Sequence, residues 1–290
     1  MQTLLSLNGN ILNREDFTIS PANRAFRYGD GVFETIRVSS GCVLWAEHHF
    51  ARLSHASDIL QFIPDQKWSQ QLLTDHVLQL CKANRHSDGD ARVRLSMYRN
   101  EGGYYTPLTN KASVLIESEA LDQTHFSLNT KGISVDIFSE IPKAYNTLSA
   151  LKSTNAQIYV LAGIHKRNKG IGDAILLNQE GRIAEATASN LFVVQNDKLI
   201  TPSLSEACVD GVMRKIIIQL ARENGFAVKE TSVTTDRLLL ADELLLTNAI
   251  QGIRWVRSFR EKRFGNRLGN KLTGLLNDYA AEYIRKKTAR

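Results

Sequence analysis

The sequence predicts an α/β (α+β) protein in which two domains each combine strands with helices. Three observations predict it. Strand-like alternation and helical periodicity both occur in the first 121 residues, periodicity is lost around Leu121–Asn129, and a second mixed set follows. A chain of 290 residues is long enough for two modest domains. We therefore expect a small domain over residues 1–121 and a large domain over residues 122–290.

The first half is expected to be rich in β-hairpins. Asn8-Gly9-Asn10 predicts a turn between short strands within Ser6–Leu12. Amphipathic periodicity predicts helices over Glu47–Gln61 and Trp68–Ala83. Candidate core positions of the first helix are Phe50, Leu53, Ile59 and Leu60. Further strands are expected at Gly31–Val38, Cys42–Trp45, Ala91–Tyr98 and Ala112–Glu117.

The second half begins with a predicted helix over Asn155–Lys169, which Gly170 ends. A second helix is expected from Val212 to about Asn224, before Gly225, and a closing helix over Leu272–Lys286. Strands are expected at Asp173–Leu177, Arg182–Ala186, Leu191–Val194, Ala227–Val233, Glu243–Thr247 and Gly252–Ser258.

The composition, 43% hydrophobic and 23% charged, is that of an ordinary globular protein. No apolar run approaches the roughly 18–20 residues that span a bilayer, and the first residues lack the basic region of a signal peptide. The three cysteines, Cys42, Cys81 and Cys208, have no metal-site spacing. We expect no metal, no disulfide framework and a cytoplasmic location.

The net charge of +6 comes partly from a basic C-terminal region. A nucleic-acid surface is one interpretation, but we expect no aromatic platform to be interleaved with these charges. We therefore expect a solvated basic face that binds no nucleic acid, or one that steers an anionic substrate or cofactor. The residues are Arg254, Arg257, Arg260, Lys262, Arg263, Arg267, Lys271 and Arg285-Lys-Lys-Thr-Ala-Arg290.

Two residues of the second half, with a helix start, match the needs of pyridoxal 5'-phosphate. That cofactor requires an amine for its aldehyde, an anion for its ring nitrogen and N–H donors for its phosphate. Lys152 precedes a helix, and Glu185 lies within the apolar strand Ile183–Thr187. Each also has a plain structural interpretation, a surface lysine at a helix start and an outward-facing strand residue.

The N–H donors are expected at Asp210-Gly211-Val212-Met213, where a helix opens with its first N–H groups unbonded. Arg52 offers a fork of further donors for the same phosphate. Both features also occur without any ligand, because glycines often precede helices and arginines often lie on amphipathic ones.

The chain resembles the class IV aminotransferase family of fold-type IV pyridoxal-phosphate enzymes. That family comprises branched-chain aminotransferases, D-amino acid aminotransferases and 4-amino-4-deoxychorismate lyases. Six motifs in the family's order, over nearly the whole chain, carry the resemblance. They are Arg27-Tyr-Gly-Asp-Gly-Val-Phe-Glu-Thr-Ile-Arg37, His49-Phe-Ala-Arg52-Leu53, Lys152-Ser-Thr-Asn155, Glu185-Ala-Thr-Ala-Ser-Asn190-Leu-Phe192, Gly211-Val-Met-Arg214 and Thr247-Asn248-Ala249.

The resemblance implies a D-amino acid aminotransferase-like fold of two domains, a cofactor between them and a homodimer. It implies that Lys152 is the catalytic lysine, which holds the cofactor and acts as general base, and that Glu185 is the partner of the ring nitrogen. The implied phosphate ligands are Arg52, the Val212 and Met213 amides, Asn248 and Ala249. Implied substrate contacts are Tyr28, Phe33 and Arg37.

Two further cues bear on the reaction. Branched-chain aminotransferases usually carry a tyrosine after the asparagine of the lysine motif, whereas this chain has Ala156. The segment Tyr98–Tyr105 is similar to a glycine-rich loop of the lyases, and its Arg99 is a candidate for binding a substrate carboxylate. Arg254 is a second candidate for that contact, and a plain hairpin loop is the alternative for the segment.

We expect a lyase that releases pyruvate from 4-amino-4-deoxychorismate and forms 4-aminobenzoate for folate synthesis. The alternative is an aminotransferase that uses 2-oxoglutarate with branched-chain L-amino acids or with D-amino acids. A more remote alternative is a cofactor-free binding protein.

Overall fold

A computed structural model describes residues 3–64, 68–86 and 89–289. Arg290 of the basic tail and the first two residues of the expected non-signal N-terminus lie outside this range. The chain forms two compact units. Unit 1 comprises residues 1–124, 152–155 and 280–290, and unit 2 comprises residues 125–151 and 156–279.

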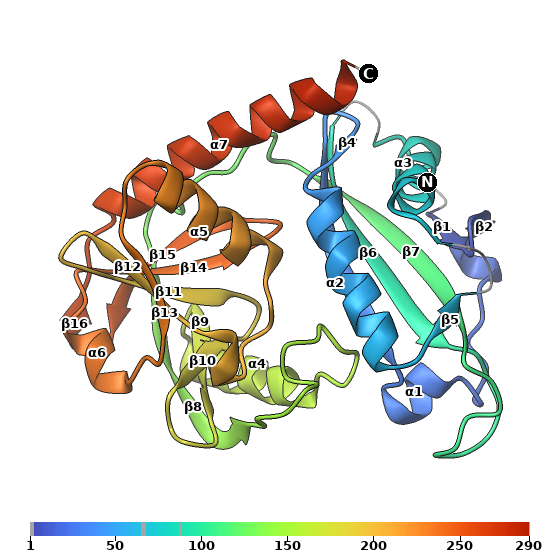
Figure 1. The fold of residues 1–290 in the computed structure, drawn as a ribbon, viewed down its shortest axis with the longest axis horizontal. Helices are drawn as coiled ribbons and strands as arrows, with labels where there is room; N and C mark the ends of the chain where they lie inside the picture. The colour runs from blue at the N-terminus through green and yellow to red at the C-terminus, as the bar shows by residue number, and fades with distance from the viewer. Residues whose placement is uncertain (1–2, 65–67, 87–88, 290) are drawn as a thin grey trace. The chain divides into compact units, whose positions relative to one another are not determined.

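Unit 1 is built on a seven-stranded sheet, drawn in blue to green in Figure 1. Its strand order is β2-β1-β7-β6-β3-β4, with neighbours antiparallel, and β5 pairs in parallel with β7. The strands are β1 (Leu4–Leu7), β2 (Asn10–Asn13), β3 (Gly31–Ser39), β4 (Cys42–Val43), β5 (Ile63–Pro64), β6 (Asp90–Arg99) and β7 (Lys111–Leu121).

The helices of unit 1 are α1 (Arg24–Tyr28), α2 (Ala46–Ile59) and α3 (Gln70–Ala83), with a 3-10 turn at Arg14–Asp16. The helix α2 packs against β3, and α3 packs against β1, β4 and β7. Ser69 caps α3 by accepting a hydrogen bond from the Leu72 N–H. Of the four core positions expected in α2, only Leu53 is fully buried.

Unit 2 is built on a nine-stranded mixed sheet with the order β10-β9-β8-β15-β14-β11-β12-β13, and β16 pairs with β15. The pairs β8–β9, β8–β15 and β12–β13 are parallel. The strands are β8 (Ile133–Lys143), β9 (Asp173–Asn178), β10 (Ile183–Ala186), β11 (Asn190–Gln195), β12 (Lys198–Pro202), β13 (Val228–Thr231), β14 (Glu243–Asn248), β15 (Gly252–Phe259) and β16 (Lys262–Arg263).

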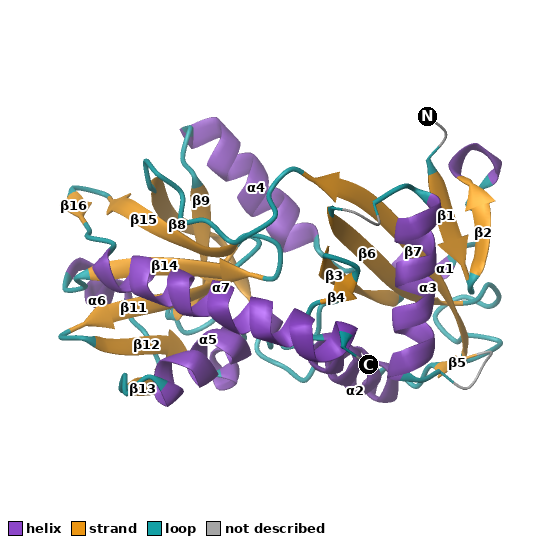
Figure 2. Ribbon diagram, turned by 90° about the horizontal axis from the view of Figure 1, so that it is seen from above, coloured by secondary structure: helices purple, strands orange, loops and turns teal. Residues whose placement is uncertain are grey.

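The helices of unit 2 are α4 (Gln157–Lys169), α5 (Val212–Glu223) and α6 (Thr235–Leu239), with a 3-10 turn at Leu204–Glu206. The helix α7 (Arg267–Thr288) contributes residues to both units. Figure 2 shows α4 beside β8 and β9, where a buried cluster joins them. The buried members of that cluster are Phe138, Ala162, Ala174 and Leu176.

The strands expected at Gly31–Val38, Ala91–Tyr98, Asp173–Leu177, Glu243–Thr247 and Gly252–Ser258 are confirmed within two residues at each end. The strands β8 and β12 were not predicted. The boundary between a small domain and a large domain at residues 121 and 122 stays a prediction.

Within residues 3–64, 68–86 and 89–289, no helix has both the length and the apolar character that crossing a bilayer requires. The three cysteines are free and buried.

Candidate active site

The segment that carries Lys152 is attached to the edge of β3. Phe33 N–H donates to Lys152 O at 2.9 Å, and Thr154 N–H donates to Gly31 O at 2.9 Å. The Lys152 Nζ lies 4.5 Å from the centre of the Phe33 ring. Unit 1 therefore brings together two predicted site residues, the lysine and Phe33, through backbone pairing and a cation–π contact.

Two glycines of the Arg27–Arg37 motif make this attachment possible. Gly29 ends α1 in the left-handed conformation with φ +64°, and a Cβ there would lie 3.3 Å from Asn155. A Cβ on Gly31 would lie 3.2 Å from Thr154 Oγ1 and 2.9 Å from Met97 O of the neighbouring strand β6. The Thr154 hydroxyl is 2.8 Å from Gly29 O. The motif therefore lets the backbone of Lys152–Asn155 approach closely.

Arg52, on α2, is held by Glu34, on β3. Its Nε donates to Glu34 Oε1 at 2.7 Å, and its Nη2 donates to Glu34 Oε2 at 2.5 Å. His49 Nδ1 is 2.6 Å from the same Oε2. Burial alone would raise the pKa of Glu34, but Arg52 and then His49 outweigh it and lower that pKa to about 2. Arg52 is thus a buried, charge-compensated residue with a fixed guanidinium.

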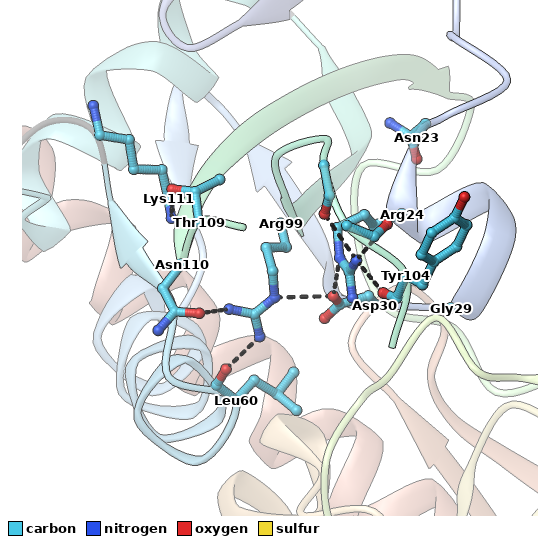
Figure 3. Close-up of polar contacts among 12 residues, drawn as sticks. Asn23, Arg24, Gly29, Asp30, Leu60, Arg99, Tyr104, Thr109, Asn110 and Lys111 are labelled. Carbon is cyan, nitrogen blue, oxygen red and sulfur yellow. Dashed lines mark hydrogen bonds and ion pairs between the residues drawn. The ribbon is translucent and has the colours of Figure 1, made fainter. Parts of the chain in front are cut away.

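Arg99 lies in a cluster of charged side chains that Figure 3 shows. Its Nε donates to Asp30 Oδ2 at 2.9 Å, and its two other nitrogens donate to Asn110 Oδ1 and Leu60 O at 2.6 Å. Arg24 donates to the same Asp30 oxygen at 2.8 Å. All three guanidinium nitrogens of Arg99 therefore have acceptors inside unit 1.

Arg24 fixes the loop that follows Arg99. Its Nη1 donates to Gly102 O at 3.1 Å and to Tyr104 O at 2.6 Å (Figure 3). The ring of Tyr28, a predicted substrate contact, lies 5.5 Å from that of Tyr105 in this loop. The loop is therefore shaped by charged side chains beneath it, while Tyr104 and Tyr105 are 78% and 89% exposed.

Arg37 is placed away from solvent, with 2% exposure. It donates through Nε to Asp90 Oδ2 at 2.8 Å and through Nη2 to Gln123 O at 2.5 Å. Arg254, the other arginine considered for a substrate carboxylate, lies in unit 2 and pairs with Asp173 Oδ2 at 3.2 Å. Both arginines thus have carboxylate partners within the chain.

Glu185 lies on β10 and is 3% exposed. Its Oε1 accepts from the Tyr159 hydroxyl at 2.7 Å and forms an ion pair with Lys143 Nζ. Its Oε2 accepts from Val209 N–H at 3.0 Å. Burial, and then Glu185, raise the pKa of Tyr159, so its hydroxyl keeps its proton and donates to the carboxylate.

Gly211, at the start of α5, lies in close contact with the side chain of Asn190. It is the N-cap residue and offers no side-chain acceptor to the first helical turn. A Cβ on Gly211 would lie 1.8 Å from Asn190 Oδ1. Asn190 is itself fixed by a bond from Nδ2 to Val209 O at 2.8 Å. The N–H groups of Val212 and Met213 thus begin a helix whose cap is bare.

The turn after β14 is linked through Asn190 to the start of α5 in unit 2. Asn248 Nδ2 donates to Ser189 Oγ at 3.1 Å, and Asn248 Oδ1 accepts from Gln251 N–H at 2.9 Å. Thr247 pairs with Asn190 across the β11–β14 ladder. Its hydroxyl is buried and has no hydrogen-bond partner within the described residues. Asn190 therefore joins the Thr247–Ala249 turn to the start of α5.

The sequence profile described as "Amino-transferase class IV" matches residues 31–259. The chain is 29% identical over 281 residues to an aminodeoxychorismate lyase of Bacillus subtilis, covering 96% of this chain and 94% of the relative. It is 30% identical over 243 residues to a putative branched-chain-amino-acid aminotransferase of Methanocaldococcus jannaschii, covering 83% and 82%.

Among solved structures, the fold is similar to a branched-chain amino acid aminotransferase of Thermobaculum terrenum in its pyridoxal-phosphate form. The TM-score is 0.82 at 21% identity, over 96% of this chain and 94% of that one. Two sheets with these helices and this motif order define an enzyme that depends on pyridoxal phosphate. The chain belongs to the class IV aminotransferase family, which confirms the expected fold class and the expectation of an enzyme.

The described residues fit the cofactor that family members bind. The bare N-terminus of α5 and the unbonded Thr247 hydroxyl suit a phosphate. The buried carboxylate of Glu185 suits a protonated ring nitrogen.

Sequence reasoning missed three partners of the site residues. Lys143 and Tyr159 both contact Glu185, and Asp30 binds Arg99. Asp30 lies inside the Arg27–Arg37 motif, so the sequence marked its position as one of interest. Lys143 lies at the end of a strand that the sequence did not predict, and nothing in its neighbourhood indicated a buried lysine.

Proposed function

We propose that this chain is a 4-amino-4-deoxychorismate lyase, which releases pyruvate and forms 4-aminobenzoate for folate synthesis. The observation that carries the proposal is Ala156. It is the N-cap residue of α4 and makes no side-chain cap bond. The branched-chain aminotransferases usually have a tyrosine at this place, and a methyl group cannot supply its hydroxyl. The B. subtilis lyase, which aligns over 96% of this chain, supports the same choice.

We propose pyridoxal 5'-phosphate as the cofactor, with Lys152 joined to its aldehyde and Glu185 at its ring nitrogen. The proposed phosphate ligands are the Val212 and Met213 amides, Asn248, Ala249 and Arg52. Glu34 holds the Arg52 guanidinium in place, so Arg52 needs no further ordering of its side chain to bind the phosphate. When bound, the cofactor supplies an electron-withdrawing ring that stabilises negative charge at the substrate α-carbon.

The chain's own groups supply proton transfer and positioning. We propose that Lys152 Nζ removes the proton from the substrate carbon that carries the amino group. Glu185 holds a proton at the ring nitrogen through its carboxylate. Phe33 lies beside Lys152, and Tyr28 lies beside Tyr105 of the exposed loop of unit 1. We propose that both residues contact the substrate. Arg37, Arg99 and Arg254 are retained as candidate carboxylate ligands, although each is paired in this structure.

A second candidate function is amino-group transfer from branched-chain L-amino acids or D-amino acids to 2-oxoglutarate. The 30% identity to a putative branched-chain aminotransferase favours it. D-Amino acid aminotransferases also lack the tyrosine that Ala156 replaces.

We further propose that the enzyme is a cytoplasmic homodimer that acts on a small amino substrate and binds neither nucleic acid nor membrane. Large exposed apolar side chains support a self-association surface on unit 1. Phe26, Tyr104, Tyr105 and Leu108 are all at least 75% exposed.

One panel of assays tests the proposal. The purified protein with pyridoxal phosphate is given 4-amino-4-deoxychorismate, L-leucine with 2-oxoglutarate, or D-alanine with 2-oxoglutarate. The proposal predicts pyruvate and 4-aminobenzoate from the first substrate, and no product from Lys152→Ala. Turnover only with an amino acid and 2-oxoglutarate would replace the lyase with the transaminase. A protein that gains no visible absorbance from the cofactor would favour the non-catalytic alternative.

A further inference from the structure

Lys143 is a buried lysine whose charge none of the proposed catalytic steps uses. It is the last residue of β8 and is 6% exposed. Its Nζ forms an ion pair with Glu185 Oε1 and donates to Ser149 O at 3.1 Å. It also lies 5.4 Å from the centre of the Tyr159 ring. Burying an ammonium group is strongly unfavourable unless its partners compensate, so this placement is specific.

The three donors to Glu185 divide unevenly between its two oxygens. Oε1 accepts from Lys143 and from Tyr159, whereas Oε2 accepts one bond, from Val209 N–H. An ionised carboxylate offers about four acceptor positions. Three donors from three different segments fix the plane of the carboxylate and leave it acceptor capacity for one more donor.

The charges around this carboxylate are few. Lys143 is the cation in contact with Glu185 among the ion pairs of the described residues. Tyr159 and Cys208 both have raised pKa values, the latter about 12, through burial and then through Glu185, so neither adds a negative charge. The negative charge of Glu185 is therefore compensated by one lysine before any ligand arrives.

We propose that Lys143 is a positioning residue that orients the Glu185 carboxylate to accept a hydrogen bond from the cofactor's ring nitrogen. This inference rests on the proposed function, in which Glu185 is the ring-nitrogen partner. Preorganised polar groups bind a ligand more strongly because they need no reordering on binding. Lys143 acts through Glu185 and does not itself touch the cofactor.

The test uses a cofactor analogue in which a carbon replaces the ring nitrogen. That analogue has nothing to donate to Glu185, so its binding is independent of how that carboxylate is oriented. Dissociation constants for pyridoxal phosphate and for the analogue are measured by tryptophan fluorescence, with apoprotein of the wild type and of Lys143→Met. Lys229→Met, at an exposed lysine of β13, is the matched control.

The inference predicts that Lys143→Met weakens binding of pyridoxal phosphate about tenfold and leaves binding of the analogue unchanged. Lys143→Arg, which keeps the charge, is expected to retain most of the wild-type preference for pyridoxal phosphate over the analogue. The control Lys229→Met is expected to retain all of that preference. Tyr159→Phe, which removes a neutral donor, should reduce the preference less than Lys143→Met does. It also provides the comparison if Lys143→Met does not fold.

Equal weakening for both ligands would overturn the inference, because Lys143 would then only support the fold. Unchanged or tighter binding of pyridoxal phosphate by Lys143→Met would overturn it as well. A wild-type protein that binds neither ligand would instead overturn the proposed function itself.

Discussion

The Nε of Arg99 donates to Oδ2 of Asp30 across 2.9 Å. That same oxygen accepts from Arg24 at 2.8 Å, so one carboxylate compensates two buried guanidinium groups. Because Arg24 also binds the Gly102 and Tyr104 carbonyls, the shape of the exposed loop depends on Asp30. Arg99 thus supports the loop and pairs within unit 1.

Replacing Asp30 with asparagine should destabilise the protein strongly. The substitution keeps the shape but leaves two buried arginines without an anion, and breaking such pairs costs about 3–5 kcal/mol. The free energy of unfolding in urea measures the effect. Glu119→Gln, which breaks the exposed pair of Arg92, is the control and should change stability by under about 1 kcal/mol. Equal small losses in both variants would contradict this account of the cluster.

Glu34 should make the protein lose stability in acid. Its folded pKa of about 2 lies below the ordinary value of 4.5, so its contribution is fully present above pH 4.5. That contribution, about 3 kcal/mol, is lost as the pH falls toward 2. Urea unfolding between pH 6 and pH 2 gives the slope for the wild type and for Glu34→Gln. The variant should be less stable but show a shallower slope, and identical slopes would refute the assignment.

Gly211→Ala should weaken cofactor binding more than it weakens the fold. The added Cβ would lie 1.8 Å from Asn190 Oδ1, so Asn190 must rotate and lose its bond to Val209 O. We expect a stability loss of about 1 kcal/mol and about tenfold weaker binding of pyridoxal phosphate. Gly274→Ala, where nothing lies within 4 Å of the new Cβ, is the control. Unchanged binding would show that the start of α5 is not a phosphate site.

Gly103→Ala should disorder the loop above the Asp30 cluster. Gly103 has φ +74°, and an added Cβ would lie 2.1 Å from Thr106 O, a backbone atom that cannot rotate away. Gly181→Ala is a matched control, because Gly181 has φ +72° and open space around it. Limited proteolysis should cut Gly103→Ala faster than Gly181→Ala, in which only the cost of the positive φ remains. Equal rates would mean that the contact with Thr106 does not constrain the loop.

Much of the fold followed from local patterns. The strand around Val93 alternates in burial as its sequence predicts, and the glycine before α5 was visible at Gly211. The strand β8 was missed although its first five residues alternate between apolar and polar side chains, Ile133, Val135 and Ile137 with Ser134 and Asp136, which is the pattern of a strand. Its parallel pairing with β9 and β15 joins residues that are distant in sequence, and that pairing could not be predicted from a local pattern.

The candidate site was predictable where a motif carries it. Lys152, Glu185 and Gly211 were predicted as site residues from their order along the chain together with the other motifs, and their roles stay predictions. Their partners were harder to predict, because Lys143 and Glu185 are 42 residues apart and an ion pair between them has no sequence period. The pairing of Arg99 with Asp30 was missed for the same reason, because a sheet brings together residues that are far apart in sequence.

The most direct test of the central claim is which lysine carries the cofactor. Protein loaded with pyridoxal phosphate is reduced with borohydride, which fixes the cofactor to its amine, and the digested peptides are examined by mass spectrometry. We expect a single pyridoxyl adduct on Lys152, absent in Lys152→Ala and unaffected in Lys143→Met. An adduct on Lys143, or none on either lysine, would contradict that claim.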